Sequence, residues 1–336
     1  MLFPMAIYLG HTTARRILES RLALALEPVP HHAMRDPEAG ARTVRSTIRS
    51  AFDKVTLQTP LARNFYCRQG EPLDLMVDGN HAVRKWDGAQ CHALSGRLPS
   101  GSFLQLESGI YVASPALCLT QLAPSMKRID IIKLAMSFCG IYQLEGDRHR
   151  ILYERNPITT PDEIGDYLDL AQGLPGVEKV RDALRWVIPN SASPMETKMV
   201  LPLYLSRHLG GYGLPRPVMN KLVILNEEAA KIAGQKVCYA DALWEEEGRR
   251  PLDFEYQSIE VHDKSDRYGA DYARQMALQR QGYTVQFVTS MQLNDEHQLN
   301  ELARLVSSHT GFWLPPKAYV WDELRKKMNE EVQSDY

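Results

Sequence analysis

The chain has 336 residues, of which 44 % are hydrophobic, 24 % charged and 8 % aromatic. This composition excludes disordered, collagen-like and coiled-coil classes, and the length predicts two folded units. The net charge of -2 hides an asymmetry: residues 1–70 carry ten Lys and Arg against five Asp and Glu, whereas residues 191–336 carry 17 against 21. A basic beginning and an acidic end fit a polyanion-contacting segment joined to a carboxylate-bearing one, and they also fit two ordinary surfaces.

The cysteines and the first residues indicate the compartment. The five cysteines lie far apart without a Cys-x-x-Cys pair, which disfavours a disulfide framework and a structural zinc site. The apolar opening Met1–Gly10 is too short for a membrane span and lacks the basic start of a secretion signal. No Walker-type glycine-rich loop is present, so no nucleotide cofactor is expected. We therefore expect a cytoplasmic protein without a membrane segment.

Two helices are predicted near the start, at Thr12–Leu26 and Arg42–Val55. In the second, Arg42, Arg45 and Arg49 recur at i, i+3 and i+7, which aligns three guanidinium groups on one face. This stripe fits contacts to the phosphates of a nucleic acid, and the alternative is an ordinary solvated face.

The middle of the chain changes pattern. Short apolar runs between residues 73 and 112, separated by turn residues, predict a β-rich or mixed region. Helices are expected after it at Pro115–Leu122, Ile129–Cys139, Pro161–Gln172 and Val177–Trp186. The Pro- and Ser-rich segment Ile188–Pro194 is the expected domain boundary. The predicted division is a basic helical segment at 1–70, a mixed region at 71–190, a C-terminal domain at 191–310 and a tail helix at 311–336.

The C-terminal domain has the clearest order of elements. The pattern predicts a helix interrupted by a proline, three strands, a helix, a strand and a further helix. Their ranges are Met195–Leu209, Val218–Leu225, Val237–Trp244, Leu252–His262, Asp266–Arg280, Tyr283–Val288 and Asp295–Val306. The predicted fold is therefore α/β (α+β), with a mixed four-stranded sheet flanked by helices.

Three carboxylates in this domain are candidate metal ligands. Glu196 lies in the first turn of the opening helix, Asp241 in the middle strand and Glu255 in the next strand, where Gln257 shares its face. A carboxylate in an apolar strand is costly unless it is paired or bound to metal, and Mg²⁺ prefers oxygen ligands. The alternative is that each faces water at a strand edge.

The motifs around these acids resemble a known family. They are Ser193-Pro-Met-Glu-Thr197, Ala240-Asp-Ala-Leu-Trp244, Phe254-Glu-Tyr-Gln-Ser258 with His262, and Asp271-x-x-Arg274 leading to Gly282-Tyr-x-Val285. Residues 191–308 thereby resemble the very-short-patch-repair-like endonuclease domain of the PD-(D/E)XK superfamily, whose core has the same element order. The N-terminal part, through Thr12–Ala14 and Gly109–Pro115, is similar to the abortive-infection antitoxin family, whose members begin with a DNA-binding winged helix.

The resemblance implies a Mg²⁺- or Mn²⁺-dependent DNA endonuclease acting in repair, restriction or phage defence. Asp241 and Glu255 match its metal-binding acids, Glu196 matches the acid of the first helix, and His262 matches a histidine that acts as general base or positions water. Gln257 replaces the superfamily's usual lysine and cannot supply its positive charge. The alternative is therefore a catalytically inactive, antitoxin-like regulator that binds nucleic acid.

Nearby cations could substitute for the missing lysine or contact DNA. They are Lys198, Lys264, Arg267 and Arg274. For Arg274, a simple ion pair with Asp271 one helical turn away is the alternative. DNA is the expected partner, a homodimer or protein partner is compatible with the sequence, and a protein-interaction scaffold is a third possibility.

Overall fold

A computed structural model describes ten stretches of the chain. They are residues 7–28, 72–78, 85–86, 89–94, 98–107, 109–145, 150–153, 155–257, 265–315 and 319–334. The predicted helix Arg42–Val55, with its arginine stripe, lies outside them. The chain is an α/β protein, as predicted, and divides into two compact units. Unit 1 comprises Met1–Ile131, Gln143–Leu152 and Ile158–Arg185, and unit 2 comprises Ile132–Tyr142, Tyr153–Pro157 and Trp186–Tyr336. Within the described stretches, no helix has the length and apolarity needed to cross a membrane.

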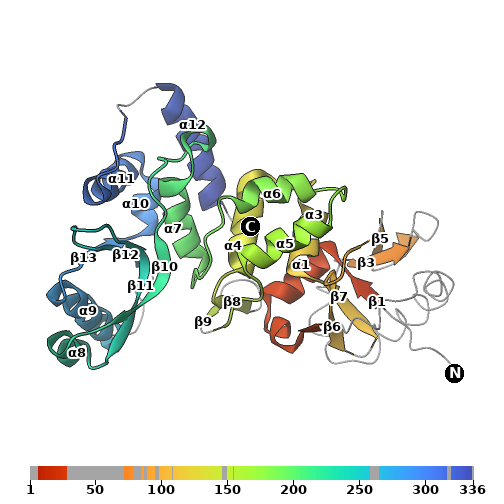
Figure 1. The fold of residues 1–336 in the computed structure, drawn as a ribbon, viewed down its shortest axis with the longest axis horizontal. Helices are drawn as coiled ribbons and strands as arrows, with labels where there is room; N and C mark the ends of the chain where they lie inside the picture. The colour runs from red at the N-terminus through yellow and green to blue at the C-terminus, as the bar shows by residue number, and fades with distance from the viewer. Residues whose placement is uncertain are drawn as a thin grey trace. The chain divides into compact units, whose positions relative to one another are not determined.

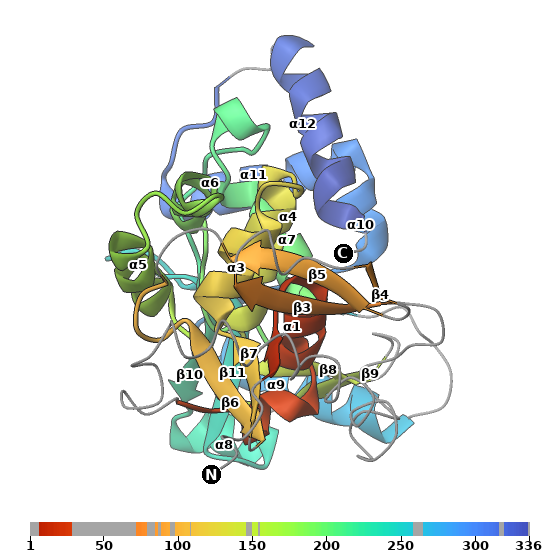
Figure 2. The same ribbon diagram turned by 90° about the vertical axis from the view of Figure 1, so that its right-hand side faces the viewer.

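Unit 1 contains a seven-stranded mixed sheet of order β2-β6-β7-β1-β3-β5-β4. The strands are β1 (Ile7–Leu9), β2 (Glu27–Pro28), β3 (Leu73–Asp78), β4 (Lys85–Trp86), β5 (Ala89–Leu94), β6 (Phe103–Glu107) and β7 (Ile110–Ala113). The pairs β1/β7 and β3/β5 are parallel, and the latter run side by side in Figure 2. The β-rich character predicted for residues 73–112 is therefore confirmed.

The helices of unit 1 are α1 (His11–Glu19), the 3-10 helix η1 (Arg21–Ala25), α3 (Pro115–Leu122), α5 (Pro161–Leu170) and α6 (Val177–Leu184). Some of these helices begin at side-chain caps, whereas α1 and α6 begin at glycines. The predicted helix Thr12–Leu26 is broken at Ser20, which is extended and whose hydroxyl accepts a hydrogen bond from the Leu22 amide. Thr160 and Glu163 form a reciprocal capping box at α5.

Between these helices, α4 (Arg128–Phe138) starts in unit 1 and continues into unit 2. The strands β8 (Tyr142–Glu145) and β9 (Arg150–Tyr153) form a two-stranded sheet that the sequence pattern did not predict.

Unit 2 is built on a four-stranded mixed sheet of order β10-β11-β12-β13 (Figure 1). The strands are β10 (Val218–Ile224), β11 (Val237–Trp244), β12 (Leu252–Tyr256) and β13 (Thr284–Val288). The first three are antiparallel, and β13 is parallel to β12. A parallel neighbour requires a crossover, which the helix α9 (Ser265–Arg280) supplies. The predicted order of helix, three strands, helix and strand is confirmed.

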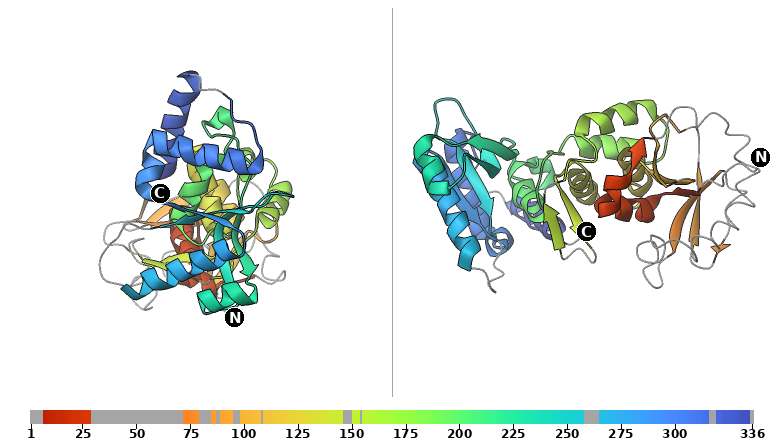
Figure 3. Two further views of the ribbon diagram at one scale, coloured as in Figure 1. Left: turned by 90° about the vertical axis from the view of Figure 1, so that its left-hand side faces the viewer. Right: turned by 90° about the horizontal axis from the view of Figure 1, so that it is seen from below.

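Further helices of unit 2 surround this sheet. They are α7 (Pro194–Tyr204), the 3-10 turn η4 (Arg207–Leu209), α8 (Glu227–Ala233), α10 (Ser290–Asn294), α11 (Glu296–Thr310) and α12 (Tyr319–Gln333). Helices α8 and α9 pack against each other beside the sheet (Figure 3), and small apolar side chains such as Ala229, Ala240 and Ala277 fill the space between them. The short helices α8 and α10 were not predicted.

Pro202 lies inside α7 without interrupting it. A proline has no N–H, so the carbonyl four residues earlier, that of Lys198, loses its helical donor. The side-chain amide of Gln333 in α12 donates to that carbonyl at 3.2 Å. The helix therefore tolerates the proline because another element supplies the missing hydrogen bond.

Two buried lysines hold the C-terminal end of α12. The Nζ of Lys133 donates to the carbonyls of Glu331 and Ser334, and the Nζ of Lys198 donates to the carbonyl of Gln333 at 2.9 Å. Cations are favourable at this end of a helix because its carbonyls carry partial negative charge. Helix α12 is thus an integral part of unit 2.

Candidate functional site

The register of the unit 2 sheet brings predicted acids together. Asp253 of β12 lies opposite Leu243 of β11, and continuing this antiparallel pairing by two residues sets Glu255 opposite Asp241. Side chains alternate along strands, so Asp241, Asp253 and Glu255 point to one face. The Tyr256 amide donates to Oδ2 of Asp241 at 2.9 Å, which fixes this carboxylate at the end of the ladder. We call these three residues the acidic site.

Asp253 is a member that the sequence analysis missed. It is fully buried, and no described donor reaches either carboxylate oxygen or Oε1 of Glu255 when both acids are ionised. Burial, together with the charge of Asp241, raises the pKa of Asp253 to about 7. Burial and the neighbouring charges therefore favour the protonated forms of Asp253 and Glu255. The signal was available, because Asp253, Glu255 and Gln257 occupy alternate positions of one strand.

Glu255 is held by Arg274 of α9. The guanidinium donates to Oε2 of Glu255 at 2.5 Å, and the two side chains are 31 % and 4 % exposed respectively. Arg274 therefore pairs across the fold with the candidate metal ligand. Burial and the neighbouring Asp253 still hold the pKa of Glu255 well above its usual range, although the guanidinium lowers it.

Glu196 is buried near the same acids, with its oxygens engaged. Its Oε2 accepts hydrogen bonds from the Ala192 amide and from the Asn220 side chain, and its Oε1 accepts one from the Ser193 hydroxyl at 3.0 Å. Burial raises the pKa of Glu196 to about 8, and the charge of Asp241 contributes to this shift. These contacts tie the start of α7 to β10, so Glu196 acts as a structural anchor beside the acidic site.

Asn220 makes this anchor possible, and no sequence pattern pointed to it. Its backbone has a φ of 45°, a left-handed conformation that asparagine tolerates better than most residues. Its amide nitrogen donates to Glu196 at 2.6 Å and to the Asn190 carbonyl at 2.8 Å.

The other predicted site residues lie in different surroundings. Gln257 follows β12 half-buried, and its backbone amide donates to the Val288 carbonyl at 2.8 Å. Lys198 is buried against α12, so the prediction that it contacts nucleic acid is wrong for this fold. Arg267 belongs to α9, but its side chain lies outside the described part of the chain, as do His262 and Lys264. The predicted stripe of Arg42, Arg45 and Arg49 lies outside it as well.

The acidic site offers oxygen ligands of the kind that divalent cations bind. Its donors are carboxylate oxygens, some without a hydrogen bond, and Mg²⁺ commonly uses one or two carboxylates with waters and a phosphate. No group of three or more His, Cys, Asp or Glu side chains in the described residues is arranged to hold a metal ion. What the residues offer is two neighbouring carboxylates, Asp241 and Glu255, with Arg274 as a counter-charge to Glu255.

No protein family, curated protein or solved structure matches this chain in the comparisons.

Proposed function

We propose that unit 2 is a Mg²⁺- or Mn²⁺-dependent phosphodiester hydrolase that acts on DNA. The observation that carries this proposal is the acidic site: three carboxylates on one face of adjacent strands, with buried oxygens that lack a hydrogen-bond donor. Burying a carboxylate oxygen in a sheet without a hydrogen bond costs free energy. A bound cation would be coordinated by these oxygens and would offset their charge.

The residues at the acidic site have different roles in the proposed reaction. Asp241 and Glu255 would hold the cation, which when bound lowers the pKa of a water molecule and shields the phosphate charge. Arg274 orients Glu255 through their hydrogen bond. The pKa values of Asp253 and Glu255 are raised, so loading of the site with a cation would be coupled to release of protons from these acids.

A second candidate is a nucleic-acid-binding regulator with this fold and no catalytic activity. The ion pair between Arg274 and Glu255 favours it, because one oxygen of the candidate ligand is already engaged. Gln257 favours it as well, since it cannot provide the charge of a catalytic lysine.

DNA cleavage distinguishes these functions. Plasmid and single-stranded DNA are incubated with Mg²⁺ or Mn²⁺ and the wild type, Asp241→Asn or Glu255→Gln, with Glu246→Gln as an exposed-carboxylate control. We expect the two site variants to lose activity by on the order of 100-fold or more, and the control to retain it. Equal activity of all four proteins would refute the assigned site.

Calorimetry with Mn²⁺ distinguishes a protein that does not bind the metal ion from one that binds it without cleaving DNA. Binding in the millimolar range or tighter that disappears in Asp241→Asn argues against the inactive regulator. Absence of both binding and cleavage in the wild type favours it.

A further inference from the structure

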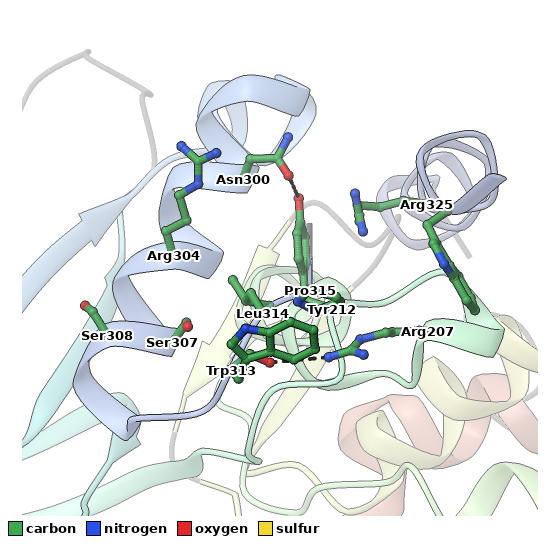
Figure 4. A pocket seen from close by; sticks show the side chains of 11 residues that line it. Arg207, Tyr212, Asn300, Arg304, Ser307, Ser308, Trp313, Leu314, Pro315 and Arg325 are labelled. Carbon is green, nitrogen blue, oxygen red and sulfur yellow. Dashed lines mark hydrogen bonds between the residues drawn. The ribbon is translucent and has the colours of Figure 1, made fainter. Parts of the chain in front are cut away.

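A second feature of unit 2 shares no residue with the acidic site. It is a cavity of about 460 Å³ between α11, the segment after it, η4 and α12 (Figure 4). Three arginines and two tryptophans line it, and none of its described lining residues is acidic, although Asp322 and Glu301 pair with two of the arginines. Its volume lies within the usual range of small-molecule sites.

The arginines make the cavity a site for an anion. Arg325 bonds Asp322 at 3.0 Å and lies 4.1 Å above the Tyr212 ring, while Arg304 is paired with Glu301. Arg207 differs, because its described hydrogen bond goes to the neutral Trp313 carbonyl at 3.4 Å, and no described carboxylate pairs with it. Its guanidinium is available to form a bidentate contact with a phosphate.

The aromatic rings give the cavity a flat apolar surface. Trp313 leaves 68 % of its surface exposed, and Figure 4 shows it in the segment after α11, beside Arg207. An exposed indole next to a guanidinium is the pairing by which proteins stack an unpaired base and bind its phosphate. Tryptophan offers this stacking surface with little loss of side-chain entropy.

A buried donor in the cavity lacks a partner. Asn300 is 8 % exposed, and its Oδ1 accepts the Tyr212 hydroxyl at 2.6 Å (Figure 4). Its Nδ2 finds no acceptor among the described residues. A buried amide that makes no hydrogen bond is costly, so the fold around this wall of the cavity is not fully satisfied.

We infer that the cavity binds one unpaired nucleotide of a nucleic-acid strand. The base stacks on Trp313, and the phosphate contacts Arg207. A phosphopeptide would use the arginines but would leave the exposed indole without a partner. The inference goes beyond the proposed hydrolase, because this binding needs neither a metal ion nor cleavage.

Fluorescence anisotropy of the full chain with a labelled single-stranded oligothymidylate, in EDTA and low salt, tests the site. Arg207→Gln and Trp313→Ala are each expected to weaken binding by roughly 5- to 100-fold. Matched controls are Arg280→Gln and Tyr272→Ala, whose residues are exposed on α9. We expect the controls to bind within about twofold of the wild type, and thymidine monophosphate to compete better than inorganic phosphate.

Three results would overturn the inference: wild-type binding by both cavity variants, equal losses in the controls, or equal competition by inorganic phosphate or a phosphopeptide. Circular dichroism of each variant excludes misfolding. Because EDTA prevents metal-dependent cleavage, a failure of the hydrolase proposal leaves this measurement unchanged, and failure here leaves the cleavage assay unchanged.

Discussion

Replacing Arg274 with Gln removes the positive charge beside the acidic site. Glu255 is 4 % exposed and its second oxygen has no donor, so the carboxylate would stay buried without a counter-charge. Breaking a buried ion pair by removing one partner costs about 3–5 kcal/mol. We expect Arg274→Gln to lower the free energy of unfolding by this amount at pH 8, and by less at pH 5, where a proton can replace the guanidinium.

Substitution of the other partner of the ion pair should lower the free energy of unfolding by less. Glu255→Gln leaves Arg274, which is already 31 % exposed and can turn toward water. The double variant removes both charges and should recover most of the stability lost by Arg274→Gln. Urea unfolding followed by tryptophan fluorescence in EDTA measures all three, with Arg280→Gln as an exposed control whose ion pair contributes little.

Equal losses for Arg274→Gln and Glu255→Gln, or no recovery in the double variant, would show that the pair does not balance a buried charge. The arginine would then contribute through packing alone.

Three further substitutions test other contacts of unit 2. Asp253→Asn should raise the free energy of unfolding by about 4 kcal/mol at pH 8.5 and about 2 kcal/mol at pH 5. The folded carboxyl has a pKa of about 7 against 3.8 when unfolded, so its contribution to stability is lost as pH rises through 7. Urea unfolding at both pH values checks this, and a pH-independent effect contradicts it. Asn220→Ala should lower the free energy of unfolding, measured by a thermal melt, by about 2–3 kcal/mol. Asn220→Gly should lower it by less, because glycine accepts the positive φ. Equal losses in the two variants would show that the whole effect comes from the lost side chain. Lys198→Met should accelerate hydrogen exchange in α12 while α3 stays unchanged, since it removes the bond to Gln333; unaltered exchange would mean that this bond does not hold the helix.

Local patterns were sufficient to predict the core of unit 2. The apolar run Val237–Trp244 and the helical spacing before Gly282 each extend over enough residues to define a strand and a helix. Antiparallel pairing of the strands then brings Asp241 to Glu255. The seven-residue helix α8 was missed, although Asn226 caps its start and Gly234 ends it, because only Ala229 of this helix is buried and the apolar pattern is weak.

The contacts that decide the chemistry could not be predicted in the same way. Arg274 was predicted to replace the missing lysine or to contact DNA, with an ion pair to Asp271 as the alternative, whereas the structure pairs it with Glu255 on a strand 19 residues away in sequence. Lys198 was expected at a nucleic-acid surface, and it is buried because α12 folds back over α7. Such pairings depend on the packing of whole elements, and a single sequence contains no local signal for them.

The two lysines at the end of α12 have a consequence for synthesis of the protein. Residues 319–334 emerge from the ribosome after the rest of the described part of unit 2, and until then Lys133 and Lys198 lack these three carbonyl acceptors. A nascent or truncated chain would therefore keep two ammonium groups hydrated and resist closing its core around them. A chain truncated before residue 319 should therefore be degraded by proteases faster than a chain that carries α12.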